Sequence, residues 1–152
     1  MTSTVEVLKT GRSLVRPELF DSLVRQIVTN EEVERDYAEG IVDQALAFVV
    51  ACADNPGAQL RPSKAVDVAW HTFILNTVDY AIFCQRIAGR FIHHQPEEFT
   101  PPGDPREMLN PTVVAIRVSG FIVDEELWSQ TTGKCSQCHQ GCTNCGQGGK
   151  AC

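Results

Sequence analysis

The last eighteen residues of the chain, 135–152, most restrict what it can fold into. They contain five of the seven cysteines, and the other residues are almost all Gly, Gln, Ser, Thr, Asn or Lys. A segment of this composition cannot fold by burying apolar side chains. We therefore expect a helical domain over residues 1–128 and a flexible Cys/Gly-rich tail over residues 129–152, which is disordered unless it binds a metal ion.

Length, charge and hydropathy exclude several classes of protein. The 152 residues are enough for one domain with a core, and a formal net charge of -6 argues against a nucleic-acid partner. The longest apolar stretch, residues 45–53, is too short to cross a membrane, and the first twenty residues do not resemble a signal peptide. We therefore expect a cytoplasmic protein whose reduced cysteines serve metal binding or redox chemistry rather than disulfide bonds.

The spacing of apolar residues predicts an all-α single domain of about five to six helices. The first four expected helices run from Pro17 to Val28, from Glu31 to about Asp54, from Lys64 to Leu75 and from Val78 to about Ala88. Pro17 suits a first helical position, Ser63 a helix N-cap and Gly89 a helix end. The second half of the second helix is apolar nearly all round, so we expect it to be the central buried helix.

The C-terminal part of this domain has fewer regular signals. Five prolines between Gln95 and Pro111 predict an irregular surface loop. Asn110 followed by Pro111 is typical of an N-cap and a first-turn proline, so a fifth helix is expected to begin there. Asp124 is expected to cap a last short helix that contains Trp128.

Polar side chains interrupt the apolar pattern of the third helix. Asp67 and His71 lie four residues apart and so meet on one face, beside Trp70. A carboxylate that contacts an imidazole fixes its tautomer, which suits a metal ligand or a general base. If the segment of His93 and His94 is extended, only one of them faces inward and joins this pair as a zinc or iron site. The alternative is a hydrogen-bonded pair that only holds helices together.

This part of the chain resembles a known family. VDVAWHTFILNTVDYAIFC, residues 66–84, is similar to the V-D-x-x-W-H-x-x-x-L…Y-x-x-F-C segment of the glycine-rich domain-containing protein-like family. The similarity covers roughly residues 60–94 and rests on Val66, Asp67, Trp70, His71, Leu75, Tyr80, Phe83 and Cys84. The resemblance implies a helical fold and no particular reaction. Many members have a second histidine at the position that Phe73 occupies here.

The tail offers a separate candidate metal site, because thiolates bind soft or borderline metal ions. The gap between its two CxxC pairs is too short for an ordinary zinc finger, so a compact wrap around one zinc ion is preferred. Cu(I) and an iron–sulfur cluster are less favoured occupants, and a thiol–disulfide switch is an alternative use. The expected ligands are Cys135, Cys138, Cys142 and Cys145, with His139 and Cys152 in reserve.

These observations favour a small protein that binds a soft metal ion, preferably zinc, through its C-terminal thiols. Two alternatives stay open. The chain also fits the precursor of a ribosomally made modified peptide, whose tail a modifying enzyme would act on. It also fits a metal- or His-dependent enzyme that uses Asp67, His71 and one of His93 and His94. A binding role is favoured over an enzyme because the chain has no phosphate-binding loop and no clear nucleophile.

Overall fold

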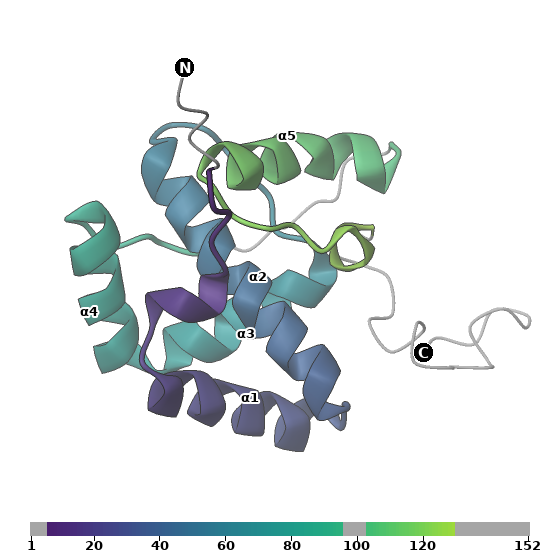
Figure 1. Cartoon of the computed structure of the whole chain (residues 1–152). Coiled ribbons are helices and arrows are strands. Elements are labelled where there is room, and N and C mark those ends of the chain that lie inside the picture. The colour runs from purple at the N-terminus through teal and green to yellow at the C-terminus, as the bar shows by residue number, and fades with distance from the viewer. Residues whose placement is uncertain (1–5, 96–102, 130–152) are drawn as a thin grey trace, which may run out of the picture.

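The computed structural model describes residues 6–95 and 103–129, which form an all-α domain (Figure 1). Within these residues the only β-type pairing is an isolated bridge between Lys9 and Phe121. The all-α prediction is therefore confirmed. The elements are the short 3-10 helix η1 (Gly11–Leu14), the helices α1 (Pro17–Glu31), α2 (Arg35–Asp54), α3 (Lys64–Leu75), α4 (Thr77–Ala88) and α5 (Pro105–Val118), and the 3-10 helix η2 (Glu125–Trp128).

Helix α2 is the central helix, as predicted. It packs against α1, α3, α4, α5 and η1, and it lies in the middle of the fold in Figure 1. Its residues from Ile41 to Ala51 are nearly all buried. Contact on every side requires apolar side chains all round the helix, which is the pattern seen in the sequence.

Buried Gln44 is the polar exception, and it ties the chain after α5 to α2. Its Nε2 donates to the Ile122 carbonyl at 2.9 Å. Its Oε1 accepts from the Asp124 N–H at 3.1 Å and from Trp128 Nε1 at 2.8 Å. Because these partners satisfy both ends of the amide, Gln44 is accommodated in the core and holds η2 against α2.

The boundary between α1 and α2 differs from the prediction. α1 begins at Pro17 as expected, but Thr29 remains helical, and the helix ends at Glu31. Glu32 then adopts a left-handed conformation with a φ of 53°, which ends the helix. α2 consequently begins at Arg35 instead of Glu31.

Helices α3 and α4 have the predicted ends to within one residue. Ser63 Oγ accepts a hydrogen bond from the Val66 N–H at 3.2 Å, so it caps α3 as expected. Only Asn76 separates α3 from α4, which begins at Thr77. Gly89 ends α4 with a φ of 67°, a conformation that glycine adopts without strain.

Helix α5 begins six residues earlier than predicted. The sequence contains two capping residues followed by proline, Asp104–Pro105 and Asn110–Pro111, and the structure uses the first pair. Asp104 Oδ1 accepts a hydrogen bond from the Arg106 N–H at 2.9 Å. The predicted loop therefore ends before α5, and Pro111 lies inside the helix, where it lacks an N–H to donate.

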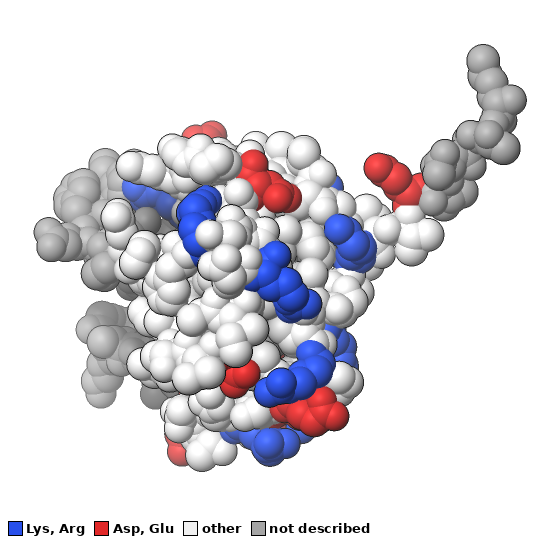
Figure 2. Space-filling model, turned by 90° about the vertical axis from the view of Figure 1, so that its left-hand side faces the viewer, with Lys and Arg blue, Asp and Glu red and all other residues white. Residues whose placement is uncertain are grey.

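No helix in the described part of the chain is long and apolar enough to span a membrane. Figure 2 shows one face of the domain, on which basic and acidic side chains lie among wide uncharged areas.

Candidate metal site

Helix α3 presents a carboxylate and an imidazole on one face. Asp67 and His71 lie four residues apart, and Asp67 Oδ2 is 3.4 Å from His71 Nδ1. The Asp67 side chain is 17% exposed, whereas that of His71 is 56% exposed. The pair expected from the spacing is thus present, with its carboxylate half-buried and its imidazole open to solvent.

His94 is the histidine that joins this pair. Its Nε2 lies 2.6 Å from Asp67 Oδ1, and its side chain is only 13% exposed. Its ring contacts the rings of Trp70 and His71, each with centroids 4.3 Å apart. His93 is exposed, and its ring contacts a neighbouring phenylalanine instead. Of the two predicted alternatives, the structure therefore places His94 beside Asp67 and His71.

A chain of hydrogen bonds fixes the segment to which His94 belongs. Trp70 Nε1 donates to the Tyr80 hydroxyl at 3.1 Å, and that hydroxyl donates to the Ile92 carbonyl at 2.5 Å. Burial raises the pKa of the Tyr80 phenol, which therefore stays protonated and able to donate. These hydrogen bonds hold Ile92, which lies two residues before His94, against α3 and α4.

Replacing Tyr80 by phenylalanine is expected to loosen this arrangement. The Tyr80→Phe change leaves Trp70 Nε1 and the buried Ile92 carbonyl without their partner, which costs about 2 kcal/mol of unfolding free energy. Because the hydroxyl holds the segment of the candidate ligand His94, the affinity of the candidate site for zinc should also fall by about tenfold. Chemical denaturation and zinc titration measure the two effects. Tyr37→Phe, at the start of α2, is the control, and equal zinc affinity in both variants would contradict the positioning role.

The geometry of the cluster is close to that of a metal site. One ligand atom each from Asp67, His71 and His94 lies within 4.8 Å of the other two. In a tetrahedral site with zinc–nitrogen and zinc–oxygen bonds of about 2.1 Å, two ligand atoms lie roughly 3.4 Å apart. Side-chain movements of roughly 1.5 Å therefore suffice to close the site. The exposed His71 ring has to move inward, and His94 Nε2 and Asp67 Oδ1, which are 2.6 Å apart, have to separate.

A cavity of about 450 Å³ opens beside the cluster. Residues 55–62, which follow α2, and residues 90–95, which follow α4, form much of its wall, and Asp67, Trp70 and His94 line it. The volume lies within the roughly 300–1,000 Å³ of ligand pockets. Asp67 and His94 are therefore accessible to a small molecule in this cavity.

The cysteines of the helical domain do not belong to the cluster. Cys52 lines the cavity, but burial raises the pKa of its thiol to about 12, so the thiol is protonated near neutral pH. Cys52 is not among the groups whose ligand atoms converge with those of Asp67, His71 and His94. Cys84 is fully buried in the core, where a free cysteine packs as a small apolar side chain.

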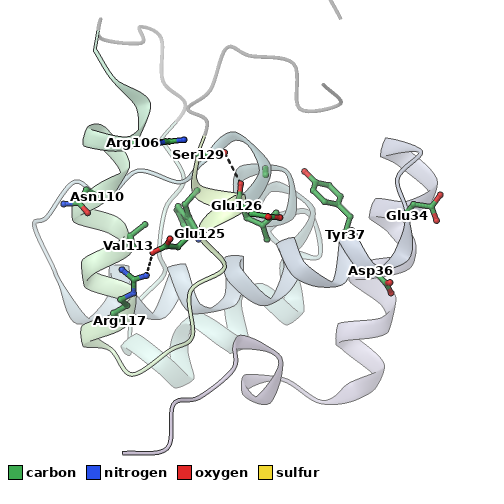
Figure 3. Close-up of a pocket in the computed structure, with 13 residues that line it drawn as sticks. Glu34, Asp36, Tyr37, Arg106, Asn110, Val113, Arg117, Glu125, Glu126 and Ser129 are labelled. Atoms are coloured by element: carbon green, nitrogen blue, oxygen red, sulfur yellow. Dashed lines mark hydrogen bonds and ion pairs between the residues drawn. The ribbon is translucent and has the colours of Figure 1, made fainter. Parts of the chain in front are cut away.

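A larger hollow of about 1110 Å³ lies elsewhere, between the start of α2, α5 and η2. In Figure 3, Arg106 and Arg117 lie on α5 on one side of it, and Tyr37 lies on the other. Arg117 is already paired with Glu125 at 2.6 Å, and the described lining contains no histidine or cysteine. We therefore place the candidate site at the smaller cavity, where metal-ligating atoms converge.

The second predicted site lies outside the described residues. It comprises Cys135, Cys138, Cys142, Cys145, His139 and Cys152. The assignment of these residues to a metal ion, and of residues 129–152 to a flexible tail, therefore stays a prediction.

The fold and the cluster define a class, namely small all-α proteins with two histidines and one aspartate gathered at the edge of a cavity. A sequence model of the UCP032817-like family matches residues 12–107, and the chain belongs to this family. The matched segment includes Asp67, His71 and His94 and ends before the tail cysteines. No match was found among curated proteins or among solved structures.

Proposed function

We propose that this protein binds a divalent transition metal ion, with zinc as the first candidate, through Asp67, His71 and His94. The observation that supports the proposal is the convergence of their three ligand atoms within 4.8 Å. His94 is 27 residues from Asp67 and comes from a different segment, so the convergence is a product of the fold. Two imidazoles and one carboxylate are a donor set for zinc and for non-haem Fe(II).

The proposed site is open rather than structural. Three protein ligands leave at least one coordination position for water or a small molecule, whereas structural zinc sites use four protein ligands. The Trp70 ring packs on one face of His94, and the cavity gives access from the side of Asp67. A bound ion is therefore expected to be exchangeable and able to bind a further ligand.

We also propose that the tail thiols bind a soft metal ion, zinc or Cu(I), independently of this site. The support is compositional, since five cysteines fall in eighteen residues that have almost no apolar side chains. A cytoplasmic location, where thiols stay reduced, is part of this second proposal. We further infer that the chain is related to the glycine-rich domain-containing protein-like family, because the segment that resembles this family contains Asp67 and His71. Enzymatic modification of the tail is the alternative, and a changed mass of the natural protein would favour it.

Metal analysis of two full-length proteins separates the proposed sites. One is the natural chain, and the other is a tail-serine variant in which five thiols are removed. Both are purified under reducing conditions and loaded with zinc. The tail-serine variant should retain one zinc ion per chain, and the natural chain should bind more. The substitutions of this variant are Cys135→Ser, Cys138→Ser, Cys142→Ser, Cys145→Ser and Cys152→Ser.

Two histidine variants in the tail-serine background test the ligands. His71→Ala is expected to weaken zinc binding by at least about tenfold and to leave stability unchanged, because the side chain is exposed. His93→Ala is the matched control, since His93 is also exposed but lies outside the cluster. Equal zinc affinity in the two variants, or a tail-serine protein that binds no zinc, would overturn the first proposal.

A further inference from the structure

We propose that the cavity beside Asp67 and His94 takes a small anion with a carboxylate or phosphate group, held between the bound metal ion and Arg90. The inference deepens the proposed function and rests on it, because the metal ion supplies one of the two positive partners. It follows from the lining of the cavity, from the position of Arg90 and from the charge that the cavity retains once Asp67 is a metal ligand.

The charges around the cavity favour an anion. Among its described lining residues, Arg61 and Arg90 are basic and Asp67 is the one acidic residue. A divalent ion more than neutralises Asp67, so the ion and Arg90 together make this part of the cavity positive. The whole chain has a formal net charge of -6, so a positive cavity has the opposite sign to the net charge of the protein. Opposite charge in a concave site raises the local concentration of anionic ligands.

Arg90 is placed to bind the acidic group. It follows Gly89, whose left-handed conformation ends α4 and turns the chain toward His94. Within the described residues Arg90 forms no ion pair with a carboxylate, in contrast to Arg16, Arg35 and Arg117. Its charge nevertheless reaches the cavity wall, because it opposes the effect of burial on the pKa of the Cys52 thiol. A planar guanidinium binds carboxylate or phosphate oxygens through two parallel hydrogen bonds.

The rest of the cavity fits the remainder of a small polar molecule. Residues 55–62 of the lining lie in turns and loops, and the apolar residues Trp70 and Phe91 also line the cavity. The backbone of this loop is held in place where Thr112 Oγ1 accepts from the Arg61 N–H at 3.0 Å and donates to its carbonyl at 2.8 Å. A few convergent charged groups in a mixed, partly apolar wall are typical of small-molecule sites.

Calorimetric titration of the full-length tail-serine variant tests the inference. Oxalate, malonate, succinate and inorganic phosphate are added separately to the zinc-loaded and to the metal-free protein. At least one anion should bind the zinc-loaded protein, at least about tenfold more tightly than the metal-free protein. The dicarboxylate series and the phosphate arm identify which acidic group is preferred.

Two arginine variants show whether Arg90 is the second partner. Arg90→Gln should weaken anion binding by at least about tenfold and leave zinc binding unchanged. Arg25→Gln is the control, because Arg25 is exposed on α1 and lies outside the cavity. Equal anion affinity in both variants, or no anion binding to protein that holds zinc, would overturn the inference while leaving the metal site in place. Failure of zinc to bind would instead contradict the proposed function, and the metal-free arm would then decide whether Arg90 binds an anion alone.

Discussion

Replacing Asp67 by asparagine is expected to remove the metal site while the fold persists. Asp67 is the residue that faces both histidines, with one carboxylate oxygen 2.6 Å from His94 and the other 3.4 Å from His71. Asparagine has nearly the same shape but no charge, so it no longer offsets a divalent ion. Loss of groups that only support metal ligands costs 10–100-fold in affinity, and we therefore expect at least about a 100-fold loss here.

Zinc competition against a chromophoric chelator measures this effect in the tail-serine background. Asp79→Asn is the matched control, because Asp79 lies on α4 and pairs with Arg16 instead of a histidine. Its zinc affinity should equal that of the parent protein. Thermal denaturation shows that both variants are folded. A folded Asp67→Asn protein with unchanged affinity would remove Asp67 from the site.

The second large effect is expected at Gly11, where the chain before α1 packs on α2. A Cβ added to Gly11 would lie 1.9 Å from the Asp43 carbonyl oxygen, which belongs to the backbone and cannot rotate away. The Arg12 N–H also donates to the Asp43 side chain at 2.8 Å. Gly11→Ala must therefore displace η1 from α2, and we expect a loss of about 3 kcal/mol in the free energy of unfolding.

Gly40→Ala is the matched control for this prediction. Gly40 lies inside α2, and a Cβ there would meet only the Leu127 Cδ1 atom, at 3.4 Å. Alanine favours helix over glycine by about 1 kcal/mol, so Gly40→Ala should be neutral or stabilising. Urea denaturation followed by circular dichroism compares the two variants. A Gly11→Ala protein as stable as Gly40→Ala would show that the close approach of η1 to α2 is not required.

Local sequence signals were sufficient to predict the start of a helix where its own first residues determine that start. Pro17 starts α1 and Ser63 caps α3, as their residue types predict. The start of α5 could not be chosen in the same way, because Asp104–Pro105 and Asn110–Pro111 are equivalent locally. The buried contact of Thr112 with the Arg61 backbone joins residues 51 positions apart and has no signature in the local sequence.

In the candidate site, too, contacts within one helix were predictable and contacts between distant segments were not. The contact between Asp67 and His71 follows from helical spacing. The Tyr80 hydroxyl holds Ile92, two residues before His94, and the spacing of the sequence does not indicate this hydrogen bond or which of His93 and His94 faces Asp67. A tyrosine among apolar helical residues was the available signal, because a buried hydroxyl needs a partner. The cavity and the position of Arg90 depend on several segments at once and were not predicted.

Nitrogen NMR of the histidine rings tests the central claim most directly. The chain has four histidines, so each ring can be assigned by single substitution in the tail-serine variant. Zinc binding shifts the resonance of the ring nitrogen that it contacts. On addition of one zinc ion per chain, we expect large shifts for a ring nitrogen of His71 and for Nε2 of His94, with His93 and His139 unchanged. Shifts at His93 or His139 without any at His71 and His94 would contradict the proposed site.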